Sequence, residues 1–475
     1  MMIFPLRFKP LTALMLAGVS ASACASVPNL GSAPQIKDAS TYAASQSFAA
    51  ATTEWPSDRW WDAYGDAQLS ALIDEALAGS PDLAQAQARV RMAQAAAQQV
   101  GSALRPSVGA TGTVGEARQS YNMGVPKDFV PQDWNDTGQV GLNVSWQLDF
   151  FGRNRAALAA ATSGAEAARA EAAAARIVLA TAVAGTYADL AQLYAAHDAT
   201  VEAVRVRAAS EALIRQRVEQ GLETQAALER AHAGRAAAEA ALAALDEAIG
   251  LTRNGIAALL GQGPDRTLSL QRPAPGAIRA FGLPQNLQLD LIGRRPDVQA
   301  ARLSAEAAAK RIDVAKADFY PNVNLMGVVG LQSLGLDSLA ESNSTFGSVG
   351  PAVSLPIFSG GRLEGAYRGA RANYDAAVAT YDGTVARAFK EVADSAVSAR
   401  ALDERLGKSR EALTASQRAY DLTKSRYVQG LGTYLDVLSA EDSLIASRRA
   451  VADLETRAFS LDVALIRALG GGYRA

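Results

Sequence analysis

The chain of 475 residues contains one cysteine and two histidines, so few side chains could take part in covalent or metal chemistry. The cysteine, Cys24, follows a basic start, an apolar stretch and the triplet Ala21-Ser22-Ala23, a pattern typical of a secretion signal. Two reactions fit: ordinary cleavage after the triplet, or lipoprotein processing that leaves Cys24 acylated. We favour acylation, because a lone cysteine in an exported chain has no disulfide partner. A leaderless helix with an incidental cysteine is the plain alternative.

The two histidines, His197 and His232, lie in long helical segments without metal-ligand spacing, so we expect them at the surface or in packing. No phosphate-binding glycine loop, Ser/His/Asp order or cysteine cluster occurs in the sequence. We therefore expect no enzyme, no metal and no cofactor, apart from a covalent lipid on Cys24. The formal net charge of −2 and the lack of a basic run give no case for nucleic acid.

The elements that would position any site are duplicated along the chain. Residues 80–108 return at 295–323, shifted by 215 positions (295 − 80), and residues 217–224 return at 426–433, shifted by 209 (426 − 217). Two copies of a large unit, neither self-sufficient, indicate a fused pseudo-symmetric assembly. The predicted segments are a signal peptide (1–23), an N-terminal lipid-anchored extended segment (24–56), a first repeat (57–263), a linker (264–282) and a second repeat (283–475).

Each repeat is predicted to contain helices, a β-hairpin and a long helical hairpin. The β-hairpins span about 106–150 and 321–358, and the helical hairpins about 153–261 and 362–470. In the first β-hairpin, apolar residues alternate with small or polar ones, which indicates strands with one apolar face. The alternating apolar residues are Val140, Leu142, Val144, Trp146, Leu148 and Phe150, then Val323, Leu325, Gly327, Val329, Leu331, Val349, Val353, Leu355 and Ile357. Pro351 weakens the last of these strands, but the pattern around it favours keeping the assignment.

Long helices are predicted because the chain is alanine-rich and lacks proline from 133 to 263 and from 357 to 475. They begin at Arg153 and Arg362 and run for 68 residues to Gln220 and Gln429, roughly 100 Å at 1.5 Å per residue. A stripe at seven-residue spacing predicts coiled-coil packing against the returning helix. The stripe is Val378, Val385, Val392, Ala399, Leu406, Leu413, Tyr420 and Tyr427. The returning helix carries Leu438, Ile445, Phe459 and Ile466 on the same spacing.

Residues 58–104 are also predicted to be helical, with one apolar face that includes Leu69 and Leu72. No segment after the signal offers about 18 consecutive apolar residues, so we expect no membrane-spanning helix and membrane entry by strands alone. Four strands cannot close a barrel, and open edges are not tolerated in lipid. Three copies would give a barrel of about twelve strands on a ring of about twelve helices, a mainly α conduit with a membrane β-barrel. A plain structural coiled coil is the alternative.

The order of several short motifs resembles the outer-membrane factors, the TolC-like channels of tripartite efflux pumps, and among them the NodT-type lipoproteins. The motifs are Trp60-Trp61-Asp62-Ala63-Tyr64-Gly65-Asp66, Arg294-Arg295-Pro296-Asp297-Val298, Phe319-Tyr320-Pro321, Leu355-Pro356-Ile357-Phe358-Ser359-Gly360-Gly361-Arg362 and Leu435-Asp436-Val437-Leu438. The resemblance implies a homotrimer in the outer membrane with a periplasmic helical tunnel. It implies a passive exit duct for drugs or other small compounds, driven by a resistance-nodulation-division pump through a periplasmic adaptor. A duct for type I protein secretion and a periplasmic coiled-coil scaffold are the alternatives.

The resemblance also implies two sites. The helical turns of the family dock onto the adaptor, which assigns adaptor contact to Gln220, Gly221, Leu222, Thr224, Gln429, Gly430, Leu431 and Thr433. Glycine permits a tight turn, and threonine offers a helix cap. The periplasmic gate is assigned to Asp436, supported by Tyr427. Like charges gathered by threefold symmetry raise each other's pKa and attract cations. Gly432 and Ser439 replace the arginine and second aspartate of other members, so the ionic latch differs here.

Overall fold

The computed structural model describes residues 27–122, 124–274 and 281–474, which form two compact units. The predicted signal peptide and Cys24 lie outside the described residues. Of the described residues, the sheet unit comprises those within 27–36, 90–168 and 301–381, and the hairpin unit those within 37–89, 169–300 and 382–474.

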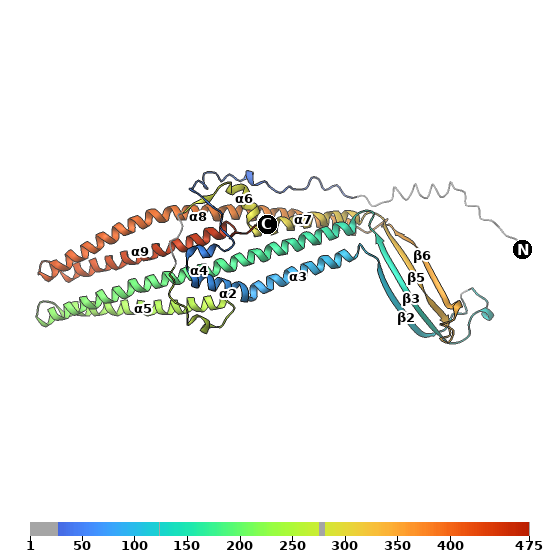
Figure 1. The fold of residues 1–475 in the computed structure, drawn as a ribbon, viewed down its shortest axis with the longest axis horizontal. Helices are drawn as coiled ribbons and strands as arrows, with labels where there is room; N and C mark the ends of the chain where they lie inside the picture. The colour runs from blue at the N-terminus through green and yellow to red at the C-terminus, as the bar shows by residue number, and fades with distance from the viewer. Residues whose placement is uncertain (1–26, 123, 275–280, 475) are drawn as a thin grey trace. The chain divides into compact units, whose positions relative to one another are not determined.

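The sheet unit is built on four antiparallel strands in the order β2-β3-β5-β6 (Figure 1). The strands are β2 (Ser107–Ala117), β3 (Asn135–Leu148), β5 (Asn322–Leu334) and β6 (Thr345–Ser354). The central pairing joins the two repeats, with Leu142 opposite Val329 and Gly141 opposite Gly330. Both β-hairpins predicted from the sequence are therefore confirmed, and they form one continuous sheet.

The register gives the sheet one apolar and one polar face, because directly opposed residues point to the same side. The apolar face carries Val108, Val114, Val140, Leu142, Val144, Trp146, Leu148, Val323, Leu325, Val329, Leu331, Val349 and Val353. The opposite face carries the polar residues Thr111, Thr113, Thr137, Gln139, Asn143, Ser145, Gln147, Asn322, Asn324, Gln332 and Ser348, together with four apolar ones, Met326, Val328, Leu334 and Phe346. On the apolar face Val114 is 71% exposed and Val349 is 81% exposed within the single chain.

Local sequence explains an end of one strand and the place of Pro351 in another. Phe150, Leu355 and Ile357, predicted as strand residues, lie beyond the ends of β3 and β6, so that part of the prediction is wrong. Asp149 explains one of these ends, because its carboxylate accepts the backbone N–H groups that open the following helix. Pro351 lies within β6 as expected, and β6 is an edge strand, where the missing N–H is tolerated.

Four long helices supply the two helical hairpins (Figure 1). They are α4 (Arg153–Glu219), α5 (Gln225–Leu259), α8 (Arg362–Val428) and α9 (Tyr434–Ala468). The predicted starts of α4 and α8 are confirmed, and their ends agree within one residue. Of the seven-residue stripe, Val392, Tyr420 and Tyr427 are buried in α8 and Phe459 and Ile466 in α9, while Ala399, Leu406, Leu413, Leu438 and Ile445 are half-buried. Val378 and Val385 are buried too, but α9 has 35 residues and α8 has 67, so the predicted packing against the returning helix does not extend to them.

The described part of the chain also contains four shorter helices. They are α2 (Ala67–Gly79), α3 (Pro81–Ser102), α6 (Leu287–Arg294) and α7 (Pro296–Ala317). The prediction of one helical stretch over 58–104 is corrected, because the chain breaks between α2 and α3 at Ser80-Pro81, where proline starts the second helix. Within the hairpin unit, Trp60, Trp61 and Tyr64 are buried with the apolar face of α2.

The remaining elements are brief. They are the 3-10 turns η1 (Ala39–Thr41), η2 (Trp60–Tyr64), η3 (Lys127–Phe129), η4 (Pro264–Thr267) and η5 (Ser342–Ser344) and the strand pair β1 (Thr52–Thr53) and β4 (Leu283–Pro284). The expectation that no helix could span a membrane needs correction. Among the described residues, α4 passes that test by length and composition, although 44% of its most apolar window is buried.

Candidate functional site: the hairpin tips

The tip of the first hairpin is a tight glycine-centred turn between α4 and α5. Gly221 has a φ of 69°, a left-handed conformation that favours glycine. Its N–H donates to the carbonyl of Val218 at 2.9 Å, and the N–H of Leu222 donates to that of Arg217 at 2.8 Å. Thr224 then caps α5, accepting the N–H of Ala227 at 3.2 Å. The turn therefore leaves Leu222 61% exposed.

The tip of the second hairpin repeats this turn between α8 and α9. Gly430 has a φ of 78°, and the N–H of Leu431 donates to the carbonyl of Arg426 at 2.8 Å. Leu431 is 63% exposed, nearly the value at the first tip. Thr433 caps α9 by accepting the N–H of Asp436 at 3.3 Å. The turn and cap roles expected for the glycines and threonines are therefore confirmed.

Asp436 is held locally, as the third residue of α9. Its Oδ2 accepts the backbone N–H of Thr433 at 2.9 Å and the Thr433 hydroxyl at 2.8 Å, which completes a capping box. These two hydrogen bonds lower the pKa of the exposed Asp436 carboxyl below its usual value. Within one chain, Asp436 is thus an ionised carboxylate next to Ser439, with which it lines a shallow hollow.

Tyr427 connects the two tips. It is buried, and its hydroxyl donates to Oε2 of Glu223 at 2.9 Å. The guanidinium of Arg217 lies 4.5 Å from the centre of the Tyr427 ring, a cation–π contact. Burial first, and then the hydrogen bond to Glu223, raise the pKa of the Tyr427 hydroxyl, which stays protonated and able to donate. The first hairpin is thereby linked to the second at their ends.

Beneath the tips, residues of all four long helices form one apolar cluster. Its members are Val206, Ile214, Ala227, Ala231, Tyr420, Tyr427, Tyr434, Val437 and Leu444. All the tip residues selected from the sequence lie in these two turns, and Tyr427 lies directly below. Sequence reasoning missed Glu223 and Arg217. The available signal was Glu223 itself, an acidic residue at the tip position where the other copy has Gly432.

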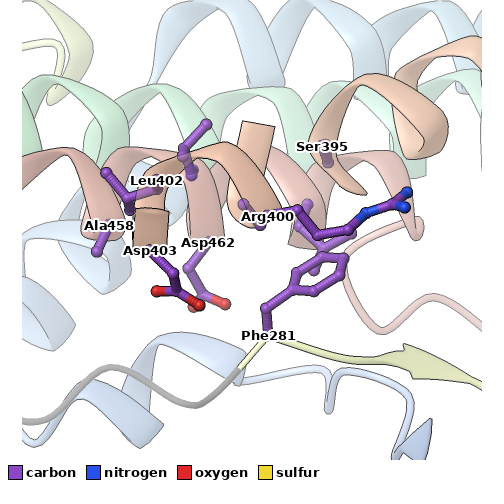
Figure 2. A pocket seen from close by; sticks show the side chains of 10 residues that line it. Phe281, Ser395, Arg400, Leu402, Asp403, Ala458 and Asp462 are labelled. Atoms are coloured by element: carbon purple, nitrogen blue, oxygen red, sulfur yellow. The ribbon is translucent and has the colours of Figure 1, made fainter. Parts of the chain in front are cut away.

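A second hollow lies in the hairpin unit (Figure 2). It has a volume of about 440 Å³ and is lined by Phe281, Arg400, Asp403 and Asp462 among others. Asp462 accepts the hydroxyl of Tyr64 at 2.6 Å, and the Arg400 guanidinium donates to backbone carbonyls. Among the described residues no group of three or more His, Cys, Asp or Glu side chains is arranged to hold a metal ion.

The two histidines have carboxylate neighbours in the first hairpin. His197 lies 3.4 Å from Asp246 and 3.6 Å from Asp198, and His232 lies 3.6 Å from Glu211. His197 of α4 contacts a carboxylate of α5, and His232 of α5 contacts a carboxylate of α4. Both are therefore packing and surface residues in the described structure.

Comparison with known proteins decides the family. A model of the outer membrane efflux protein family matches residues 72–262 and 288–471. The chain belongs to the outer membrane efflux protein family. The crystal structure of the outer membrane protein VceC from Vibrio cholerae is 44% identical, with a TM-score of 0.84 over 88% of this chain and all of that one. The structure of the outer-membrane channel OprN is 28% identical, with a TM-score of 0.82 over 94% of this chain and 98% of that one.

Named relatives agree with the structures. The multidrug resistance outer membrane protein MdtP of Escherichia coli is 30% identical over 432 residues, covering 90% of this chain and 88% of that protein. The pyoverdine export outer membrane protein OpmQ of Pseudomonas aeruginosa is 30% identical over 472 residues, covering 96% of each. The four-stranded sheet and the long helical hairpins are thus the strand and tunnel parts of this family fold. The protein is an outer-membrane efflux channel.

Proposed function

We propose that three copies of this chain enclose a passive exit duct for drugs or other small compounds in the outer membrane. The observation that carries this proposal is the four-stranded sheet with two open edges and one exposed apolar face. In lipid, open edges must be paired, and four strands are too few to close on themselves. The proposed repeats, residues 57–263 and 283–475, each supply one β-hairpin and one helical hairpin to this wall.

The trimer is tested by conductance of purified protein in planar bilayers, together with its mass in detergent. We expect a stable trimer that forms ion-conducting channels. Val140→Asp on the apolar face should abolish insertion, because a charge facing lipid is costly. Gln139→Asp, one residue away on the polar face, should insert normally. A conducting monomer, or equal effects of the two substitutions, contradicts the proposal.

We also propose that the two tips dock a periplasmic adaptor, which couples the duct to a resistance-nodulation-division pump. Each tip presents an exposed leucine on a glycine turn, flanked by Gln220 or Gln429. A photo-crosslinking residue at Leu222 or Leu431 should capture the adaptor in cells that carry the complete pump. The same residue at Leu251, which is 62% exposed on α5, should not capture it. Equal capture from all three positions contradicts tip docking.

The gate is proposed at Asp436, with Tyr427 in support. Threefold symmetry would gather three Asp436 carboxylates, and a ring of like charges at a constriction attracts cations. Asp436→Ala is expected to raise the conductance and the leakage of large antibiotics into cells. Asp421→Ala, which removes an exposed carboxylate of α8 from the same hairpin, is the control. Unchanged leakage in Asp436→Ala excludes Asp436 from the gate.

Acylation of Cys24 is proposed from the course of the N-terminal segment within the sheet unit. Val27 and Leu30 pack against a cluster that includes Phe319 and Leu363, where α8 begins. Arg371 of α8 donates to the carbonyls of Gly31 and Ser32. Cys24 is three residues from Val27, a reach of roughly 10 Å. A lipid on Cys24 would anchor this segment to the membrane.

Mass spectrometry of the mature N-terminus tests this anchor. We expect cleavage before Cys24 and a mass increase that corresponds to acylation. Cys24→Ser should yield an unlipidated chain. A mature N-terminus without lipid in the wild-type protein contradicts the proposal.

A further inference from the structure

A polar hollow lies at the end of the sheet where β3 leads into α4 and β6 leads into α8. It has a volume of about 430 Å³, and all its lining residues belong to the sheet unit. The strand register places three of them, Gln147, Asn322 and Ser354, on the face opposite the apolar one. In the proposed duct the apolar face contacts lipid, so the hollow opens to the lumen.

Two stacked aromatic rings line the hollow. The ring centres of Phe151 and Tyr320 lie 4.9 Å apart, with an angle of 13° between the ring planes. Each ring uses only one face in this stack, and the two residues are 48% and 46% exposed. A planar aromatic solute can therefore stack on a ring face that the protein leaves open.

The two arginines of the hollow, Arg153 and Arg362, hold matched positions in the two repeats (362 − 153 = 209). Nε of Arg153 lies 2.5 Å from Oδ1 of Asp318, so its charge is paired. Within the described part of the chain, no carboxylate lies at ion-pair distance from Arg362. Its guanidinium is free to bind an anionic group of a solute.

The carboxylates of the hollow already have partners. Asp318 is paired with Arg153, and Asp149 accepts the backbone N–H groups of Asn154 and Arg155. The Asp149 carboxylate also lies 3.2 Å from Nε of Arg155. The charge left to interact with a solute is therefore the positive charge of Arg362.

The repeats indicate that the trimer would not pair Arg362 by the same contact. Arg153 meets Asp318 where β3 adjoins β5, and in the proposed trimer β6 would adjoin β2 of the next copy in the same way. The counterpart of Asp318 in the first repeat is Ala103 (318 − 215), which has no charge. Arg105, two residues further on, would add a second positive charge at this contact.

Asn322 supplies a polar atom without a partner. Its Oδ1 is buried and accepts no hydrogen bond from the described residues. A buried acceptor is costly to leave unsatisfied, so this atom favours a solute that carries a hydrogen-bond donor, such as a phenolic hydroxyl.

We propose that this hollow binds hydroxylated aromatic carboxylates as they pass through the duct. The open ring faces of Phe151 and Tyr320 contact the aromatic ring, and the Arg362 guanidinium binds the carboxylate. The hydroxyl of the solute donates to Asn322. The inference rests on the proposed duct, because the hollow faces a lumen only when the barrel is closed. It adds a substrate class to that duct.

Saturation-transfer NMR on the purified trimer tests the charge, with the three hydroxybenzoate isomers as probes. We expect at least one isomer to bind. Hydroxybenzyl alcohol, which keeps the ring and the hydroxyl without the charge, should bind about tenfold more weakly, and Arg362→Gln should weaken hydroxybenzoate binding about tenfold. Arg368→Gln is the matched control, because Arg368 is an exposed arginine of α8 that pairs with Glu364 and does not line the hollow. It should bind like the wild type.

The ring contact is tested in the same assay. Phe151→Leu should weaken binding about fivefold, because aromatic stacking adds to the energy of apolar burial. Phe358→Leu changes a residue that is 90% exposed and lies outside the hollow, so binding should be unchanged. Binding that resists both Arg362→Gln and Phe151→Leu overturns the proposed site.

The current through single channels separates this inference from the duct itself. A solute bound in the lumen should reduce the current of the wild type and of Arg368→Gln, and leave that of Arg362→Gln unchanged. A trimer that conducts but binds no isomer, or that loses binding equally in both arginine variants, overturns the inference while the duct stands. Binding that depends on Arg362 in a protein that does not conduct supports the hollow as a site although the duct proposal then fails.

Discussion

The first and second hairpin tips share a backbone and differ in charge. Both turn on a left-handed glycine, both close with a 2.8 Å hydrogen bond from the following leucine, and both cap the next helix with threonine. Their side chains diverge at matched positions that include Val218, Glu219, Glu223 and Ala227 of the first tip, which correspond to Tyr427, Val428, Gly432 and Asp436 of the second. The turn is thus a requirement of the fold. The charged side chains around the turn differ between the tips. Glu223 of the first tip accepts the hydrogen bond from the hydroxyl of Tyr427 in the second.

The largest expected difference between the tips is at the matched pair Tyr427 and Val218. Tyr427→Ala removes a buried ring from the cluster that joins all four helices and should lower the free energy of unfolding by about 3 kcal/mol. Val218 only borders that cluster, so Val218→Ala should cost about 1 kcal/mol. Thermal unfolding in detergent measures both. Equal losses would mean that the tyrosine does not join the hairpins.

The glycines should respond alike at the two tips. Gly221→Ala and Gly430→Ala each place a side chain on a left-handed backbone, at a cost of about 1–2 kcal/mol. An added Cβ meets no atom within 4 Å at either site, so the cost comes from the backbone alone. Gly407→Ala, inside α8 and equally open, should instead stabilise by up to about 1 kcal/mol. A marked difference between Gly221→Ala and Gly430→Ala would show that the tips are not equivalent turns.

Removal of the threonine caps should destabilise the two tips by slightly different amounts. Thr224→Ala and Thr433→Ala each lose a cap, at about 1 kcal/mol. Thr433→Ala should cost more, because the hydroxyl also donates to Asp436. Hydrogen exchange in the first turns of α5 and α9 measures the two effects separately, and a serine at either position should restore protection. Greater fraying at α5 than at α9 would contradict the role assigned to the capping box.

The smallest expected effect is the pH response of the second tip. The lowered pKa of Asp436 means that its capping contribution is fully present above the ordinary carboxyl pKa and is lost as the pH falls through the lowered value. The first tip has Ala227 at this position and should not respond. Exchange in the first turn of α9 should therefore accelerate as the pH falls through the Asp436 pKa, which the Thr433 hydrogen bonds lower and which, in the proposed trimer, the other two Asp436 carboxylates raise. Asp436→Asn should remove that dependence, and acid fraying of α5 to the same extent would argue against the capping box as its source.

Much of this architecture could be predicted because it depends on local patterns. The alternation in β3 fixed its apolar face, and the absence of proline together with the glycine turns located α4 and α8 within one residue. The missed break at Ser80-Pro81 was also local, since proline is favoured at the start of a helix.

The partners across the hairpins could not be predicted in the same way. Glu223 meets Tyr427 across 204 positions, and Ser210 meets Glu441 across 231, and no periodicity within one helix encodes which helices face each other. A partial signal existed at Glu441, an acidic residue on the helical face that carries Val437 and Leu444. Such a residue points to a buried partner without identifying it.

Pro351 affects how the edge strand β6 can pair before the chain reaches the outer membrane. The backbone groups of an edge strand can form hydrogen bonds with strands of other chains, and β6 is such an edge strand. A newly exported chain crosses the periplasm with this edge unpaired. Pro351 has no backbone N–H, so a strand that pairs with β6 at this residue loses one hydrogen bond. The proline thus discourages strand addition at this edge before the chain reaches the membrane.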